Sequence, residues 1–164
     1  MKGNLVMDKQ QVRDFWNQAS SGKTLYLTYV DKAGYMRQAE ARYAHEGKMI
    51  FNLAGFDRSK GLMVLEVGVG LGADHQQFAE AGAELFGIEL TERAIDHTQR
   101  RFATFNLKSN LGIGVTENLE FADMVFDQVY SWGVLHHSSD TPTAISEVWR
   151  VLKVGKGGEH YGLP

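Results

Sequence analysis

Three glycines alternate with apolar residues directly after an apolar run that ends in an acid: Glu66-Val67-Gly68-Val69-Gly70-Leu71-Gly72. Glycine has no Cβ atom, so such a turn can bend sharply and let a ligand approach main-chain amides, while the helix that follows offers unpaired N–H groups. The pattern predicts a nucleotide-type binding turn between a strand and a helix. It also fits the dinucleotide-binding fingerprint, in which the last glycine can be alanine, and a glycine-rich turn without a ligand.

A second acid, Glu89, ends the next apolar run about twenty positions after Gly68. A carboxylate at a strand tip beside the glycine turn can accept hydrogen bonds from both hydroxyls of a ribose, whichever nucleoside is bound. The alternative is a solvated acid at the end of a strand. These two features together do not distinguish a nicotinamide dinucleotide from S-adenosylmethionine.

Two adjacent histidines, His136 and His137, follow the fourth apolar run. Because imidazole titrates near neutral pH and parallel sheets present ligands at the carboxyl ends of their strands, either histidine is a candidate general base. The alternative is a histidine that caps a loop or packs beneath the ligand. Asp74 and His75 open the helix after the glycines and are expected to support the turn, because no second pair at metal-ligand spacing accompanies them. We expect no metal site.

These residues need a frame in which strands alternate with helices. The apolar runs predict strands at 61–67, 83–90, 111–115 and 126–132, and helical periodicity predicts helices at 72–82, 92–105 and after Asp140. Thr91 and Asp140 are the predicted N-caps of the last two helices. Strands that alternate with helices form a parallel sheet with right-handed crossovers and helices on its faces. The sequence therefore predicts an α/β, Rossmann-like fold.

The first 60 residues predict a mostly helical cap before an α/β core at 61–164, the two forming one structural domain. One helix is expected after Asp8, with Val12, Phe15, Trp16 and Ala19 on one face, and a second from 35 to about 50, with Gly47 as its end. The cap either covers the sheet edge or forms a lid over the ligand that carries Trp16, Tyr26 and Tyr43.

Composition narrows the function classes. The chain has 164 residues, a net charge of −3, 43% hydrophobic residues and no cysteine. One domain with its own core is expected, and the missing cysteines exclude a disulfide scaffold and a thiolate nucleophile. No basic field is present to hold a phosphate backbone, so we expect a small-molecule substrate and no nucleic acid. Without a long apolar run or a signal peptide, we expect a cytoplasmic protein with no membrane partner.

Five stretches, in order, resemble the successive motifs of one enzyme family. They are 64–72, Gly87-Ile88-Glu89-Leu90-Thr91, Glu117-Asn118-Leu119, 126–137 and 144–153. The chain resembles the class I S-adenosylmethionine-dependent methyltransferases over residues 60 to 158. The likeness is greatest to the small-molecule branch that includes the ubiquinone- and menaquinone-biosynthesis enzymes. Nicotinamide enzymes have no reason to carry the block Val134-Leu135-His136-His137.

The resemblance implies S-adenosylmethionine as the cofactor and S-adenosylhomocysteine as its product. It implies that Glu66 and the amides around Gly68 and Gly70 hold the amino-acid part, that Glu89 binds the ribose and that Leu90 packs on the adenine. The remaining implied cofactor-binding residues are Gly72 in the turn, Thr116, Glu117 and Asn118 after the third strand, and Ser131, Trp132 and Gly133 at the sulfonium end.

The sequence departs from the family pattern at two places that bear on the expected activity. Val115 stands where family members usually carry an aspartate that binds the adenine amino group, so we expect weakened cofactor binding. The family's Lys-Pro-Gly-Gly turn appears as Lys153-Val154-Gly155, and the chain stops at Pro164. We therefore expect a C-terminally truncated member that lacks the later strands and forms a homodimer through the exposed edge of its fourth strand.

Three functions remain open from the sequence. The first is methyl transfer from S-adenosylmethionine to a small molecule. The second is a non-catalytic module, derived from a methyltransferase by truncation, that binds the cofactor or serves assembly. The third, a nicotinamide-dependent oxidoreductase, is supported only by the glycine turn.

Overall fold

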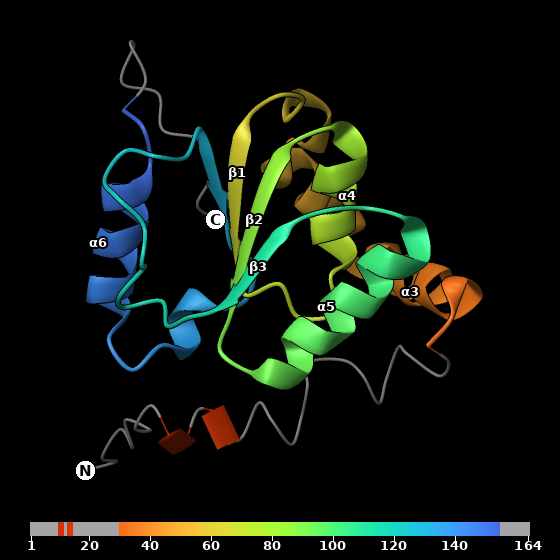
Figure 1. The fold of residues 1–164 in the computed structure, drawn as a ribbon, viewed down its shortest axis with the longest axis horizontal. Helices are drawn as coiled ribbons and strands as arrows, with labels where there is room; N and C mark the ends of the chain where they lie inside the picture. The colour runs from red at the N-terminus through yellow and green to blue at the C-terminus, as the bar shows by residue number, and fades with distance from the viewer. Residues whose placement is uncertain (1–9, 12, 15–29, 155–164) are drawn as a thin grey trace.

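A computed structural model describes residues 10–11, 13–14 and 30–154 of the chain. Within these residues, four strands form one sheet in the order β3-β2-β1-β4, and every neighbouring pair is parallel (Figure 1). The strands are β1 (Met63–Val67), β2 (Glu84–Glu89), β3 (Asn110–Ile113) and β4 (Gln128–Tyr130). Each predicted strand is present and shorter than predicted, with β3 beginning one residue before its predicted start, and the predicted Rossmann-like parallel sheet is confirmed.

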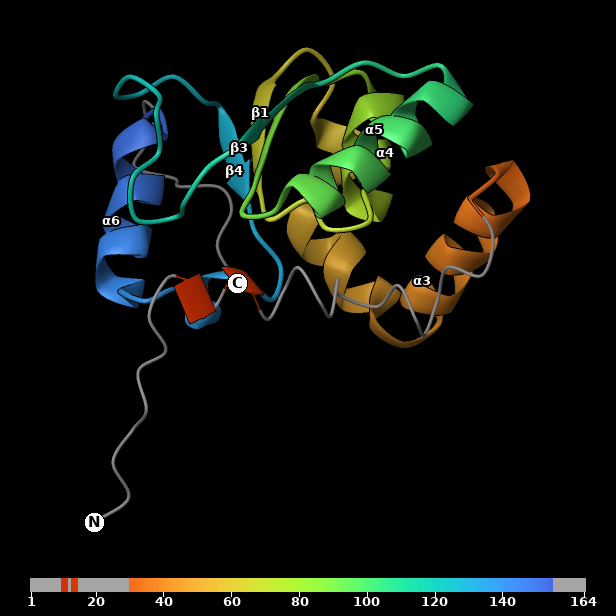
Figure 2. The same cartoon turned by 60° about the horizontal axis from the view of Figure 1, so that its bottom comes forward.

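Helices cover both faces of the sheet. One face carries α3 (Lys32–Ala54), α4 (Ala73–Ala81) and α5 (Glu92–Phe105), and the other carries α6 (Thr141–Val151) (Figures 1 and 2). Two short 3-10 helices, η1 (Phe56–Arg58) and η2 (Leu135–His137), lie in the connections. Both predicted N-caps are confirmed: the side chain of Thr91 accepts from the Ala94 amide, and that of Asp140 accepts from the Thr143 amide.

The helix α3 differs from its prediction at the C-terminal end. The sequence predicts an end at Gly47, which is wrong, because the helix continues past this buried glycine and ends at Gly55. Gly55 has φ +57° and donates its N–H to the Phe51 carbonyl at 3.2 Å, which is the left-handed helix end that glycine favours. At the other end, the Asp31 carboxylate accepts from the Gly34 amide at 2.6 Å.

Successive side chains of β1 pack into two separate hydrophobic cores. Leu65 and Val67 point toward α6 and pack with Val148 and Val151, whereas Val64 points the other way and packs with Phe78 of α4. All six side chains are fully buried. This is the alternation expected of a strand covered on both faces, and each such side chain contributes about 1.5–3 kcal/mol on burial.

The outer edge of β4 is paired at its start. Phe126 forms a parallel bridge with Leu152, and the Lys153 amide donates to the Phe126 carbonyl at 2.8 Å. Within the described ranges this is the only pairing on that side of β4.

The predicted helix after Asp8 is described only at residues 10–11 and 13–14, which are helical. The predicted lid residues Trp16 and Tyr26, and the tail from Gly155, lie outside the described residues.

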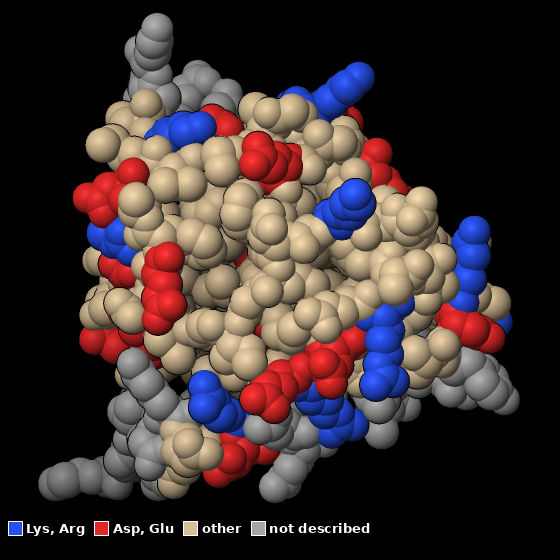
Figure 3. All heavy atoms as spheres, in the orientation of Figure 1, with Lys and Arg blue, Asp and Glu red and all other residues tan. Residues whose placement is uncertain are grey.

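The described surface mixes both signs of charge. On the face shown in Figure 3, acidic and basic side chains are scattered around a broad uncharged area. None of the described helices is long and apolar enough to span a membrane.

Candidate functional site

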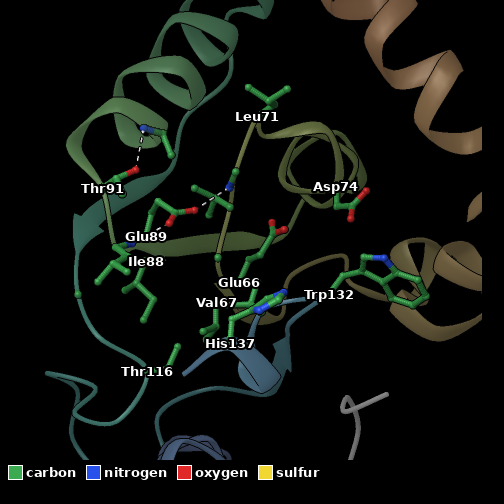
Figure 4. Close-up of a pocket in the computed structure, with 18 of the residues that line it drawn as sticks. Glu66, Val67, Leu71, Asp74, Ile88, Glu89, Thr91, Thr116, Trp132 and His137 are labelled. Carbon is green, nitrogen blue, oxygen red and sulfur yellow. Dashed lines mark hydrogen bonds between the residues drawn. The ribbon is translucent and has the colours of Figure 1, made fainter. Parts of the chain in front are cut away.

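A cavity of about 210 Å³ opens at the carboxyl ends of the strands, where chain connections leave β1 in opposite directions. Figure 4 shows Glu89 and Thr91 on one side, Trp132 on the other and Glu66 between them. Most of the predicted site residues line its wall. They are Glu66, Gly68, Gly70, Gly72, Glu89, Leu90, Thr116, Glu117, Trp132, Gly133 and His137.

The three glycines of the turn all have positive φ, at +85° for Gly68, +53° for Gly70 and +73° for Gly72. Each has a different neighbourhood. A Cβ atom on Gly68 would overlap the Val134 side chain, and one on Gly72 would lie 3.0 Å from Thr98, so both positions are needed for close packing. Gly70 has no atom within 4 Å of the place where a Cβ would stand, so it borders the open cavity.

Glu89 lies at the tip of β2, where its carboxylate is held by main-chain amides. Oε2 accepts from the Gly70 amide at 3.0 Å, and Oε1 accepts from the Leu90 amide at 2.7 Å. Burial raises the pKa of Glu89, and these hydrogen bonds oppose the shift. Each carboxylate oxygen can accept more than one hydrogen bond, so Glu89 retains capacity for ligand hydroxyls while it fixes the glycine turn.

Glu66 lies near the end of β1, buried at 3% exposure, and lines the cavity. Its Oε2 is 2.8 Å from Nδ1 of His75, and Nε2 of His75 is 2.7 Å from Oγ of Ser109. Burial, followed by the neighbouring Asp74 carboxylate, raises the pKa of Glu66 well above its ordinary value. Burial lowers the pKa of His75 to about 3.

Asp74, in the first turn of α4, accepts hydrogen bonds from three residues on two other elements, α3 and β4. Arg42 of α3 binds both carboxylate oxygens, Nε to Oδ1 at 3.1 Å and Nη2 to Oδ2 at 2.6 Å. The hydroxyls of Tyr43 and Tyr130 each donate to Asp74 at 2.9 Å. Tyr43, a predicted lid aromatic, thus joins α3 to the glycine turn. This role of Asp74 agrees with the predicted support of the turn.

His136 and His137 are neighbours on η2 but differ in their relation to the cavity. Their rings lie 3.9 Å apart between centroids, yet only His137 belongs to the cavity wall. Partial burial and then the neighbouring His136 lower the pKa of His137, so its imidazole is mainly neutral at pH 7 and can accept a proton.

Several of the residues predicted to bind the cofactor also make contacts that hold the segments around the cavity in place. Glu117 lines the cavity, but its Oε1 accepts from both the amide and the hydroxyl of Ser139, which ties the loop after β3 to the loop after η2. Ser131 is buried behind the wall and donates to the Val67 carbonyl at 3.0 Å. Asn118 is also off the wall, where it forms a bridge with Val115. Trp132 lines the cavity and donates to Glu46 at 3.2 Å.

Sequence reasoning missed the contribution of α3. Gln38 and Arg42, one turn apart, line the cavity from this helix, and Arg42 is the only Lys or Arg on the described wall. No local pattern distinguishes Arg42 from the exposed Arg37 on the same helix. Among the described residues, no group of three His, Asp or Glu side chains is arranged to hold a metal ion.

Comparison with known proteins agrees with this geometry. Residues 65–158 match the family model described as methyltransferase domain. A ubiquinone biosynthesis O-methyltransferase of Maricaulis maris is 26% identical over 143 residues, which cover 87% of this chain and 54% of that protein. A demethylmenaquinone methyltransferase of Tropheryma whipplei is 29% identical over 149 residues, covering 88% of this chain and 56% of that protein.

A solved structure shows the same fold. The magnesium protoporphyrin IX methyltransferase of Synechocystis PCC 6803, determined with bound SAH, superposes with a TM-score of 0.68 at 20% identity and covers 88% of this chain and 68% of that one. The chain spans about half the length of the two curated relatives described above. The family match extends over more than half of the chain and includes the glycine turn, Glu89 and η2, and on this evidence the chain belongs to the methyltransferase domain family.

Proposed function

We propose that the chain binds S-adenosylmethionine in this cavity and transfers its methyl group to a small-molecule acceptor, with S-adenosylhomocysteine as the other product. The observation that carries the proposal is that Glu89, the glycine turn and Glu66 line one cavity that also reaches His137. Membership of the methyltransferase domain family supports it, as do the relatives named for ubiquinone and demethylmenaquinone.

The charge of the wall fits this cofactor better than a dinucleotide. Among the described residues of the wall, four are acids, Glu66, Asp74, Glu89 and Glu117, and Arg42 is the only Lys or Arg. S-adenosylmethionine carries a sulfonium, an ammonium and one carboxylate, whereas a nicotinamide dinucleotide brings a pyrophosphate with two negative charges. Because like charges repel strongly in a partly buried site, this acidic wall favours S-adenosylmethionine, whose net charge is positive, over the negatively charged dinucleotide.

The arrangement of the wall suggests where each part of the cofactor lies. The open space beside Gly70 accommodates the chain of the ligand, because no described atom lies within 4 Å of the place where a Cβ would stand. We assign the ribose to Glu89, the adenine to Leu90 and Thr116, the amino-acid end to Glu66 and the amides near Gly68 and Gly70, and the sulfonium end to Trp132 and Gly133.

When bound, the sulfonium supplies an electrophilic methyl group with a good leaving group, so positioning and exclusion of water provide most of the acceleration. The helix α3 closes one side of the cavity through Gln38 and Arg42, which is the part of the proposed lid within the described residues. His137 lies on the wall with a lowered pKa, and we assign it the removal of a proton from the acceptor.

A second candidate is cofactor binding without turnover. It is favoured by Val115, which lies on the wall where it cannot accept a hydrogen bond from an adenine amino group. An unpaired polar group of this kind costs about 1–3 kcal/mol, or roughly one to two decades of affinity.

Calorimetric titration with S-adenosylmethionine, S-adenosylhomocysteine and a nicotinamide dinucleotide tests the binding. We expect one site per chain for the first two ligands and no heat for the third. Transfer from a labelled methyl donor to a panel of small acceptors then separates the two candidates. Binding of the dinucleotide, or no binding of either adenosyl ligand up to about millimolar, would overturn the proposal.

A further inference from the structure

The acid at the centre of the cavity has one hydrogen bond to the described protein. Glu66 lines the cavity, and its hydrogen bond to Nδ1 of His75, at 2.8 Å, is the only one it makes with the described residues. His75 is completely buried and does not belong to the wall of this cavity. The donors and acceptors behind His75 therefore determine whether Glu66 or His75 carries the proton of this hydrogen bond.

That chain begins at a group that can only accept. Ser109 Oγ lies 3.1 Å from the carbonyl oxygen of Leu85, so the hydroxyl donates its hydrogen there. Its oxygen must then accept from Nε2 of His75, 2.7 Å away, which requires a proton on Nε2. A neutral imidazole protonated on Nε2 has a lone pair on Nδ1, and the hydrogen bond between His75 and Glu66 needs a donor. The remaining donor is a protonated carboxyl group on Glu66.

The surroundings of Glu66 favour the same charge state. Burial and the carboxylates of Asp74 and Glu89 raise its pKa, against the opposing effect of Arg42. Arg42 is itself bound through two points to Asp74, which limits the charge it offers to Glu66. Tyr130, from β4, directs its hydroxyl to Asp74. Burial also lowers the pKa of His75, which disfavours an imidazolium beside an ionised Glu66.

We propose that Glu66 carries a proton in the ligand-free protein, held by His75 and Ser109 as positioning residues, and that binding of the cofactor's ammonium group releases this proton to solvent. The proposal rests on the proposed function and deepens it by coupling cofactor binding to pH. A protonated acid offers the ligand ammonium only a neutral carbonyl oxygen, whereas the carboxylate adds the attraction between opposite charges, so binding of the ammonium favours the ionised form. The O–H bond of Glu66 breaks, its electron pair stays on the carboxylate and the proton leaves through the open cavity, so the hydrogen bond to Nδ1 of His75 is replaced by hydrogen bonds that the ligand ammonium donates to the carboxylate.

Transfer of the proton to His75 is the competing route, and the structure opposes it. An imidazolium at Nδ1 would place two cations, itself and the ligand ammonium, on one carboxylate. His75 has no exposure to water, so its charged form would lose all hydration. Solvent is therefore the destination of the proton.

The first test needs no ligand. Nitrogen-15 NMR of the full chain distinguishes a protonated ring nitrogen from one with a lone pair, and it is read at His75 in the free protein. We expect a proton on Nε2 and a lone pair on Nδ1. A proton on Nδ1, as in an ion pair with ionised Glu66 or in the other neutral tautomer, would overturn the assignment.

The second test counts protons. Calorimetry at one pH near 6.5 in buffers of different ionisation enthalpy gives the protons released per ligand bound. With S-adenosylhomocysteine we expect protons to be released, up to one per ligand, and an association constant that rises with pH by at most about tenfold per pH unit. Methylthioadenosine shares the nucleoside and lacks the ammonium, so its binding should release none. Equal heats for S-adenosylhomocysteine in all buffers would contradict the proposal.

Variants assign the source of the proton. In Glu66→Gln the amide can still donate to His75, but nothing titrates, so release should vanish and affinity should no longer depend on pH. Ser109→Ala removes the acceptor that holds the Nε2 proton and should reduce the release, whereas Ser146→Ala, on the exposed face of α6, should match the wild type. Full release from Glu66→Gln would overturn the assignment.

Failure of the proposed function gives a different result. If no adenosyl ligand produces heat in any buffer, the cofactor assignment and the proton release are both wrong. The NMR measurement still decides the protonation of Glu66 in that case.

Discussion

Arg42 of α3 and Asp74 of α4 form a two-point ion pair, with Nη2 2.6 Å from Oδ2 and Nε 3.1 Å from Oδ1. The pair joins α3 to the first turn of α4, which immediately follows the three glycines. Asp74 is 3% exposed, whereas the Arg42 side chain keeps 26% of its surface in solvent. The carboxylate therefore depends on its protein partners, and α3 is fixed to the cavity at this point.

Replacement of Arg42 should destabilise the fold. Arg42→Met leaves a buried carboxylate with only the two tyrosine hydroxyls as donors, and we expect a loss of about 2–4 kcal/mol in the free energy of unfolding. Urea denaturation measures it, with Arg37→Met on the exposed side of α3 as the matched control. The double variant Arg42→Met, Asp74→Asn should recover part of the loss, because no buried charge remains. Equal stability of Arg42→Met and Arg37→Met would contradict this account of the pair.

A bulky side chain at Gly70 should block the cavity. Gly70→Trp projects into open space, so the chain should fold with only the strain of its φ of +53°, about 1–2 kcal/mol. Binding of S-adenosylhomocysteine, measured by calorimetry, should fall below detection. Gly61→Trp is the control, because Gly61 also has positive φ and open surroundings but lies away from the cavity wall. Wild-type affinity in a folded Gly70→Trp variant would refute the placement of the ligand.

Loss of the acid at the tip of β2 should weaken nucleoside binding. Glu89→Ala removes the acceptors proposed for the ribose and also releases the Gly70 amide, so we expect a 10- to 100-fold loss of affinity, or about 1.4–2.8 kcal/mol. Glu84→Ala, at the exposed start of the same strand, should bind like the wild type. If both variants bind equally well, Glu89 is a structural acid only.

Above pH 6.5, where the His75 contribution no longer changes, the raised pKa of Glu66 should make the stability of the free protein fall as pH rises. The raised pKa of Glu66 means that its contribution is present below its ordinary value of 4.5 and is lost as pH rises through the folded pKa. The lowered pKa of His75, about 3, acts oppositely, but its contribution is already complete above 6.5. The raised pKa of Glu89 has the same sign as that of Glu66.

Denaturant unfolding from pH 6.5 to 8.5 checks this dependence. The slope should not exceed about 1.4 kcal/mol per pH unit for each proton, and it should be smaller in Glu66→Gln. Stability that does not change with pH in this window would show that Glu66 is already ionised in the folded protein at pH 6.5.

Self-association through β4 remains a prediction. The described part of the chain pairs the outer side of this strand only at Phe126, through Leu152, and leaves the residues of β4 without a second partner among the described strands. Unpaired strand edges favour association. Sedimentation velocity at micromolar concentration should show a concentration-dependent dimer. A single monomeric species over that range would contradict the prediction.

The elements near the glycine turn were predictable because their signals are local. Thr91 caps α5, and the helix runs over residues 92–105 as its apolar spacing predicts. The left-handed glycines of the turn and the acid at the tip of β2 also follow from short-range patterns, because backbone freedom and strand alternation act over a few residues. Parallel pairing then places Glu89 beside Gly70, whichever side chains fill the rest of the core.

Other features depended on contacts between distant segments. No pattern near Gly47 in the sequence shows that α3 continues until Gly55. The helix tolerates a glycine in its interior because tertiary packing supports it there, and this packing is not visible in the sequence. Arg42 meets Asp74, and Ser109 meets His75, across more than thirty residues of chain. The difference between His136 and His137 arises only when η2 turns one ring toward the cavity. Sequence determines which groups can accept or donate, but hydrogen-bond polarity and burial, and hence the charge of Glu66, are set only when the folded chain brings the partners together.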